Sequence, residues 1–273
     1  MKRILLCVII FNILFSCRTN LPITDDFHYG VFLTRKIKND TMYLTFDNLL
    51  KCPARLVFDD EKLQSLFVRG NATVLPPFKD TKVKISMKDI ATVNFNHKIL
   101  YGDLNNKVRL VKFGLPFLGN RTYKIEQGYN GKYSHSTAGK EYALDINLSV
   151  GDTVCAAYDG VVVYVEKKYE KSGTTKKWIP LSNQIILYHP SCGLFSNYSH
   201  LKKNSVFVEE GDSVKIGQPI GLVGMTGFTS GPHLHFEVSK PSENGLQTVM
   251  TEFIEPYIGV YLKKGDEVRK GHN

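Results

Sequence analysis

The stretch Gly231–Val238 constrains the fold more than any other part of the chain. It opens with a Gly-Pro pair, which marks a turn, and continues with alternating polar and apolar residues, which are typical of a β-strand. Alternate side chains of a strand share a face, so His233, His235 and Glu237 point one way and the apolar residues between them point the other. Two imidazoles standing on one face suit a metal site, provided that other segments supply further ligands.

Three more residues can complete such a site. Catalytic zinc takes three protein ligands and keeps one position open, so the ligands must converge from separate segments. His135 lies in a loop ten residues before Asp145, and Asp145 lies on the polar side of an apolar alternating segment at residues 141–148. His200 follows in a further strand-like segment.

Two motifs in this region resemble those of the lysostaphin-like, LytM-type zinc metallopeptidases. They read Tyr198-Ser199-His200-Leu201 and Gly231-Pro232-His233-Leu234-His235-Phe236-Glu237. The resemblance extends over about residues 125–238, although the His-x9-Asp spacing is longer than the compact His-x3-Asp form of part of the family. The resemblance implies an antiparallel β-sheet metallopeptidase domain and a peptide of bacterial peptidoglycan as substrate.

The resemblance also implies roles for individual residues. One zinc ion would be held by His135, Asp145 and His235. His200 and His233 would lie beside the zinc as catalytic residues, because an imidazole can exchange a proton or donate a hydrogen bond to an oxyanion. Which of the two plays which part stays open, and so does whether Glu237 orients an imidazole or is a solvated strand residue.

Two other functions compete with that of a hydrolase. A non-catalytic LytM-type module could bind or regulate a cell-wall enzyme, but relatives of that kind typically lack ligands, whereas this chain keeps all three. The stretch at 211–221, Gly-Asp-x-Val-x-x-Gly-x-x-Ile-Gly, resembles the hairpins of biotinyl or lipoyl carriers, and its first four residues recur as Gly-Asp-x-Val at Gly151 and Gly265. The corresponding turn near Met225 has no lysine to modify, and a tight turn entering a strand explains the pattern without a carrier function.

The first residues predict export. A short basic start, an apolar run and a small residue at its end indicate a secretory signal at 1–16. Leu14-Phe15-Ser16-Cys17 resembles a bacterial lipobox, which implies a lipoprotein signal peptide, cleavage before Cys17 and lipid on its thiol. The predicted location is the cell envelope, with the chain lipid-anchored to a bacterial membrane. A plain cleaved signal and an uncleaved anchor are the alternatives.

The remaining chain is predicted to be mostly β. We expect a tether at 17–26, a small β-sandwich-like domain at 27–115, the LytM-type peptidase domain at 116–265 and a tail at 266–273. Alternation at residues 42–46 and 83–87 indicates strands, as do the apolar runs at 66–68 and 93–95. The first domain could position the peptidase or bind a protein partner.

Composition excludes several other classes. The chain has 273 residues, 42% of them hydrophobic, and a formal net charge of +9 that is spread without a long basic run. No nucleic-acid recognition motif accompanies that charge, so we expect no nucleic-acid partner. Cys52, Cys155 and Cys192 form no CxxC pair, which excludes a cysteine-based zinc site, and whether Cys155 pairs with Cys192 stays open.

Overall fold

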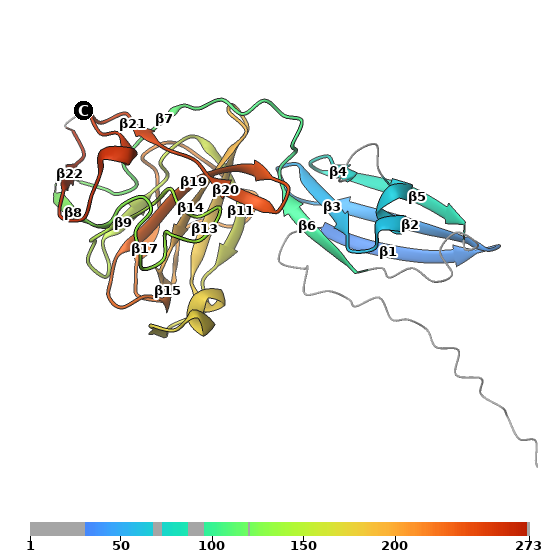
Figure 1. Cartoon of the computed structure of the whole chain (residues 1–273), viewed down its shortest axis with the longest axis horizontal. Helices are drawn as coiled ribbons and strands as arrows, with labels where there is room; N and C mark the ends of the chain where they lie inside the picture. Colours follow the sequence, from blue (N-terminus) through green and yellow to red (C-terminus); the bar gives the residue numbers. More distant parts are fainter. Residues whose placement is uncertain (1–30, 68–72, 87–95, 120, 272–273) are drawn as a thin grey trace, which may run out of the picture.

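The structure is a computed structural model that describes residues 31–67, 73–86, 96–119 and 121–271. The expected signal peptide, Cys17, the tether and the strand at 93–95 lie outside these residues. Within them, no helix is both long enough and apolar enough to cross a membrane. The described chain is built almost wholly from antiparallel sheets, which confirms the predicted mostly β fold (Figure 1).

The N-terminal part consists of two three-stranded antiparallel sheets. Its strands are β1 (Val31–Lys38), β2 (Thr41–Asn48) and β5 (Lys79–Ser86) in one sheet, and β3 (Ala54–Phe58), β4 (Thr73–Leu75) and β6 (His97–Tyr101) in the other. Alternate side chains of β2, among them Met42, Leu44 and Phe46, are buried as the sequence predicts. They share one apolar core with residues of the second sheet.

The strand expected at 66–68 is wrong. Helix α1 (Glu61–Phe67) covers its first two residues. The backbone N–H of Leu63 donates to the carboxylate of Asp60 (2.9 Å), so Asp60 caps the helix N-terminus. The sequence does contain a local signal for this helix, because Asp60 lies three residues before Leu63 as an N-cap residue. The apolar run at 66–68 favoured a strand over that signal.

The C-terminal part is built on one nine-stranded sheet. Its strands, in spatial order, are β16 (Ser213–Val214), β11 (Gly160–Glu166), β13 (Gln184–His189), β14 (Leu194–Ser199), β19 (Leu234–Ser242), β9 (Ala143–Ile146), β8 (Thr122–Gln127) and β22 (Glu267–Arg269), with β20 (Gly245–Thr248) pairing with β19. Because β22 pairs with β8, residues 267–269 of the expected tail extend this sheet.

Smaller elements surround the large sheet. They are the three-stranded sheet of β10 (Thr153–Cys155), β17 (Pro219–Val223) and β15 (Leu201–Val206), the parallel pairs β12 (Ser172–Gly173) with β18 (Gly227–Phe228) and β7 (Lys112–Phe113) with β21 (Glu252–Phe253), and the 3-10 helices η2 (Lys176–Leu181) and η3 (Gly259–Tyr261).

The alternation in β19 sorts its side chains as predicted. Leu234, Phe236 and Val238 are at most 1% exposed and belong to the main apolar core. His235 and Glu237 therefore stand on the opposite face of the sheet. The large sheet thus packs one face on its own core and leaves the other available for chemistry.

The three Gly-Asp-x-Val copies fold into the same turn. Gly151, Gly211 and Gly265 have φ values of 93°, 95° and 94°, the left-handed region that favours glycine. In each copy the aspartate carboxylate accepts the backbone N–H three residues earlier, at 2.8–2.9 Å. The arrangement is that of a type II turn, which needs a positive φ only at its third position. The interpretation as a turn that enters a strand is confirmed.

The N-terminal part packs on the same face of the large sheet that carries His235. Three strands of that sheet contribute apolar side chains to the N-terminal core: Val163, Tyr188 and Phe195. The contact also includes Arg55, which is 1% exposed and donates to the carbonyl oxygens of Gly102 (3.1 Å) and Ser242 (2.6 Å). These contacts join the two parts at one end of the sheet (Figure 1).

His189 and the cysteines are core residues. Cys52, Cys155 and Cys192 are all free and buried, so Cys155 and Cys192 are not paired. His189 is fully buried; its Nδ1 donates to the carbonyl of Asp159 (2.9 Å), and its Nε2 accepts from the hydroxyl of Ser196 (2.8 Å). Burial lowers the pKa of His189 to about 4, so the ring is neutral at pH 7.

We expect His189 to make the fold sensitive to acid. Below pH 6.5 the unfolded chain binds a proton at this ring and the folded chain does not, so stability falls between pH 6.5 and 4 by up to about 3 kcal/mol. Urea unfolding of the wild type and of His189→Asn should therefore show a stability gap that is wide at pH 7 and narrower at pH 4.5. A gap that is constant with pH would contradict this cause.

Candidate metal centre

His235 and Asp145 face each other across neighbouring strands. β19 pairs antiparallel with β9, and the register places His235 directly opposite Asp145. Directly opposite residues on one face have Cβ atoms about 4.5–5.5 Å apart, so the imidazole and the carboxylate meet. His135, 1% exposed, reaches them from the long connection between β8 and β9. The three expected ligands are thus brought together from segments up to 100 residues apart.

The donor atoms of these residues converge on one point. His135 Nε2 lies 3.2 Å from Asp145 Oδ1 and 3.3 Å from His235 Nδ1, and His235 Nδ1 lies 2.9 Å from Asp145 Oδ1. Zinc bonds of about 2.0–2.2 Å place tetrahedral donors about 3.3–3.6 Å apart, so the trio needs to open by only a few tenths of an ångström. Nitrogen and carboxylate donors are also the types that zinc accepts. The residues fit a zinc ion.

Hydrogen bonds behind the donors fix which atom of each ligand faces the centre. His135 Nδ1 donates to the carbonyl of Gly128 (3.0 Å), which leaves Nε2 as the free lone pair. The amide Nε2 of Gln127 donates to Asp145 Oδ2 (3.0 Å), so Oδ1 remains the oxygen that is turned toward the histidines. The ligand trio is therefore oriented before any ion binds.

Glu237 is a buried partner of His235 and not a solvated strand residue. Its side chain is 3% exposed, and its Oε1 lies 2.6 Å from the ammonium of Lys140. Its Oε2 lies 3.5 Å from His235 Nε2, too poorly aligned to count as a hydrogen bond but with no other partner in the described chain. A ligating histidine usually donates its second N–H to a carboxylate. Glu237 is placed to accept it after a small rotation of the ring.

The charges of this group are strongly coupled. Burial opposes ionisation of Asp145, but the adjacent imidazoles of His135 and His235 hold the pKa of its carboxyl well below the usual range. Burial would also lower the pKa of His235, but its hydrogen bond with Asp145 and the nearby carboxylate of Glu237 raise that pKa to about 9. Without a metal, the protonated ring of His235 and the ammonium of Lys140 thus balance the two buried carboxylates.

His200 and His233 stand beside the ligand trio. Their ring centroids are 4.6 Å apart, and His233 Nε2 lies 3.6 Å from Asp145 Oδ1. His200 Nδ1 donates to the carbonyl of Thr226 (2.7 Å), and His233 Nδ1 donates to that of Gly231 (3.0 Å), so each Nε2 is left available. The two catalytic candidates therefore lie where a substrate held at the centre would meet them.

His200 occupies an unusual position. Its φ of 66° is rare for a residue with a side chain and occurs where the chain turns from β14 into β15. Burial and the neighbouring rings of His233 and His235 lower the pKa of His200 to about 3. In the metal-free chain this imidazole is therefore neutral at pH 7.

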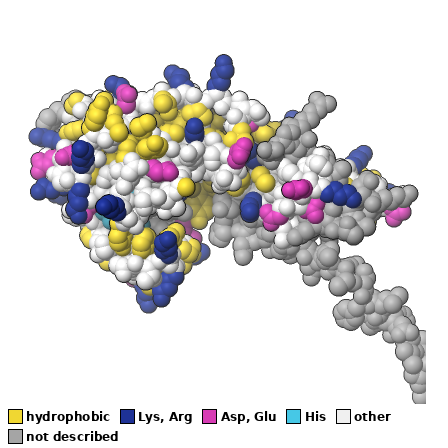
Figure 2. Space-filling model, in the orientation of Figure 1, with side chains coloured by type: hydrophobic (Ala, Val, Ile, Leu, Met, Phe, Trp, Pro, Cys, Tyr) yellow, Lys and Arg dark blue, Asp and Glu magenta, His cyan; other side chains and the backbone are white. Residues whose placement is uncertain are grey.

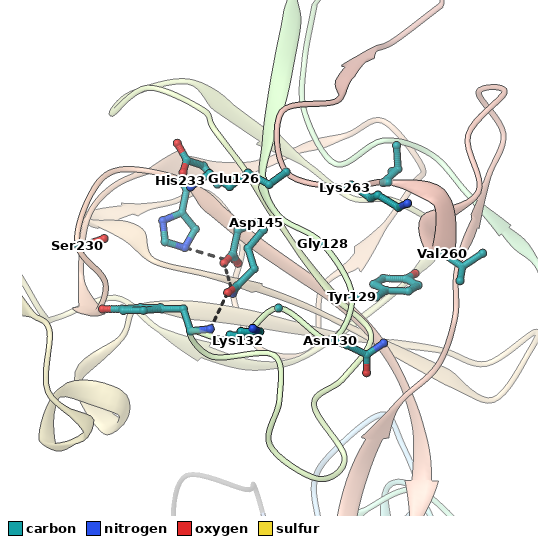
Figure 3. Close-up of a pocket in the computed structure, with 15 residues that line it drawn as sticks. Glu126, Gly128, Tyr129, Asn130, Lys132, Asp145, Ser230, His233, Val260 and Lys263 are labelled. Atoms are coloured by element: carbon teal, nitrogen blue, oxygen red, sulfur yellow. Dashed lines mark hydrogen bonds and ion pairs between the residues drawn. The ribbon is translucent and has the colours of Figure 1, made fainter.

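Two hollows flank the centre and share Asp145, His233 and Tyr133 in their walls. The larger, about 590 Å³, is drawn in Figure 3, and the smaller, about 390 Å³, lies over the sheet face beside His200 and His235. The rings of Tyr133 and Phe228 stack with 5.2 Å between centroids, and both residues line the smaller hollow. The centre thus lies in the middle of a cleft.

The long polar segment after β11 contributes to the cleft wall. Within this segment η2 supplies Lys176 and Ile179 to the smaller hollow. Strand β12 of the same segment pairs in parallel with β18, so the segment lies against the loop that precedes His233. The segment therefore shapes one side of the cleft and does not simply extend into solvent.

Some residues of the site have no sequence signal. Gln127 and Lys140 support the ligands or their partner Glu237, yet neither belongs to a motif. Each one acts through a contact set by strand register or by the path of a loop. Lys140 lies in the extra length of the His-x9-Asp loop, so that insertion carries the counter-ion of Glu237.

Comparison with known proteins agrees with this geometry. Residues 139–249 match peptidase family M23, so this part of the chain is similar to that family. An uncharacterized metalloprotease of Buchnera aphidicola is 29% identical over 54% of this chain and 38% of its own length. The peptidoglycan DD-endopeptidase ShyB of Vibrio cholerae is 35% identical over 42% of this chain and 25% of its own. The chain therefore spans well under half the length of these relatives.

A solved structure shows a similar domain. The catalytic domain of the antimicrobial peptidase lysostaphin from Staphylococcus simulans is 26% identical to this chain, with a TM-score of 0.33. The match covers 47% of this chain and 88% of the lysostaphin domain.

We expect Glu237 to support metal binding. Glu237→Gln removes the charge that faces His235 and Lys140, and loss of such a partner usually costs 10–100-fold in metal affinity. Zinc affinity, measured by competition with a chromophoric chelator, should fall by about that factor. Glu267→Gln, an equal charge change at an exposed site, should leave it unchanged. Wild-type affinity in Glu237→Gln would show that the carboxylate plays no part.

Proposed function

We propose that the chain is a zinc metalloendopeptidase that hydrolyses peptide bonds of bacterial peptidoglycan. One observation carries the proposal: three donor atoms suited to zinc and two further imidazoles meet in the middle of an open cleft. A non-catalytic binding module would need neither of the two further imidazoles. The M23 match and the name of the Vibrio relative support the choice of a peptidoglycan peptide as substrate.

The proposed ligands are His135, Asp145 and His235. When bound there, zinc supplies Lewis acidity, which polarises a peptide carbonyl and makes a water molecule more acidic. His200 and His233 supply proton transfer and hydrogen bonding: an available Nε2 can accept a proton from the attacking water, return it to the leaving amine, or donate to the oxygen that gains charge.

The proposed location is the cell envelope. The predicted signal peptide and lipid on Cys17 would hold the enzyme at a membrane surface within reach of the wall, although both lie outside the described residues. The name of the Vibrio relative refers to peptidoglycan, and this supports an envelope or extracellular site of action. The proposal also gives the N-terminal part a possible role, which is to bind a protein partner.

Two variants separate the roles of the paired histidines. His235→Ala should remove zinc and activity together, because it deletes a ligand. His233→Ala should keep most of the zinc and lose activity by about 10²-fold or more, the usual scale for a proton-transfer or oxyanion group. Zinc content by mass spectrometry and cleavage of muropeptides measure both effects. Equal loss of zinc in the two variants would show that ligand and catalytic residue are misassigned.

Digestion of purified sacculi tests the activity itself. The chain from residue 18, loaded with zinc, should release soluble fragments whose new termini identify the bond that is cut. Removal of zinc by a chelator should stop the release, and added zinc should restore it. A protein that binds zinc stoichiometrically but releases nothing would instead be the non-catalytic module that binds or regulates a cell-wall enzyme.

A further inference from the structure

The larger hollow has a cationic end that faces away from the metal centre. Figure 3 shows His233 and Asp145 toward the left and Lys263 and Val260 toward the right of the same cavity. Lys264 follows Lys263 in the same wall, and Lys132 from the loop after β8 also lines the cavity, below Asp145 in Figure 3. A substrate bound at the centre would extend past these ammonium groups on one side of the scissile bond.

The wall that carries Lys263 and Lys264 is firmly packed. A Cβ on Gly128 would collide with the carbonyl oxygen of Leu262, so the two backbones are in close contact. The hydroxyl of Tyr129 accepts the backbone N–H of Thr251 (2.9 Å), which fixes the same loop to the C-terminal segment a second time. Gly128 also accepts the hydrogen bond from His135, so this wall and the metal ligand share one support.

The two lysines are held on a defined turn. They occupy the first two positions of the third Gly-Asp-x-Val turn, in which the carboxylate of Asp266 accepts the backbone N–H of Lys263 (2.8 Å). The turn itself does not require lysine, because the same positions are Ser149 and Val150 in the first copy and Glu209 and Glu210 in the second. They also lie beyond residue 249, where the M23 match ends. The charge is thus a feature of this chain and not of the turn or the family domain.

In the part of the chain that the structure describes, no carboxylate pairs with these ammonium groups. Within the described chain, Lys132, Lys263 and Lys264 have no ion pair, whereas the nearby Lys140 is paired with Glu237. Glu126, the remaining acid in the wall besides Asp145, accepts instead from the side-chain amide of Asn147 (2.9 Å). A cavity with unpaired lysines attracts an anionic ligand.

We propose that this end of the cleft binds a free carboxylate of the substrate peptide, and that Lys263 and Lys264 select substrates that carry one. The inference rests on the proposed peptidase function and adds to it a preference for acidic peptides. Ammonium–carboxylate hydrogen bonds are strengthened by charge, but exposed ones are screened by water. We therefore expect a preference of about tenfold, expressed in binding and not in the chemical step.

The test compares two forms of one substrate. Soluble cross-linked muropeptides are used with their carboxylates free, and again after conversion of those groups to methylamides. The zinc-loaded wild type should show a KM about tenfold lower for the free form and a similar kcat for both. Lys263→Gln/Lys264→Gln should bind the free form as weakly as the amidated one, with kcat unchanged.

A matched control carries the same charge change elsewhere. Lys202 and Lys240 are exposed and line neither hollow, so Lys202→Gln/Lys240→Gln should keep the wild-type preference. A double variant at 263 and 264 that still prefers the free form overturns the inference, and so does a wild type that treats both forms alike.

Calorimetric titration of the same two ligands separates this inference from the proposed function. If the zinc-loaded wild type cuts neither form, the peptidase proposal fails, while binding still decides the inference. Tighter binding of the free form that is lost in the double variant upholds the carboxylate site. Equal binding of both forms to the wild type, or an unchanged difference in the double variant, rejects it.

Discussion

The register between β19 and β9 is the constraint on which the site depends. It sets His235 opposite Asp145, so that one buried carboxylate contacts two imidazoles and must be balanced by a proton or a cation. A slip of one residue would turn every side chain of β19 to the other face. Leu234 and Phe236 prevent it, because they would then leave the core. The apolar core therefore fixes the geometry of the polar centre.

The sequence anticipates the parts of the site that depend on local pattern. Alternation gives the faces of β19 and β9, and the family motifs bring His135 and His200 into the same group. The sequence does not anticipate the contacts of Gln127 with Asp145 and of Lys140 with Glu237, because these depend on how separate strands and loops come together. The helix at 61–67 was missed for a local reason: three apolar residues outweighed the capping signal of Asp60.

The C-terminal segment does more than close the sheet. β22 pairs with β8, and the turn before β22 rests against Gly128, whose carbonyl orients His135. The proposed carboxylate site and the orientation of His135 thus share one support, the contact between the backbones of Leu262 and Gly128. A change in this segment, which lies beyond the family match, would therefore affect both the proposed binding of a substrate carboxylate and the hold on the ligand trio.

The N-terminal part occupies the same face of the large sheet as the cleft. Along β13, Gln184 lines the smaller hollow, Ile186 packs against the N-terminal core, and Tyr188 is buried in it. Two residues of a strand advance about 7 Å, so little open sheet separates the hollow from the N-terminal part. The N-terminal part therefore limits this sheet face at one end: an extended chain laid along the face in that direction would have to bend away from the sheet or end there.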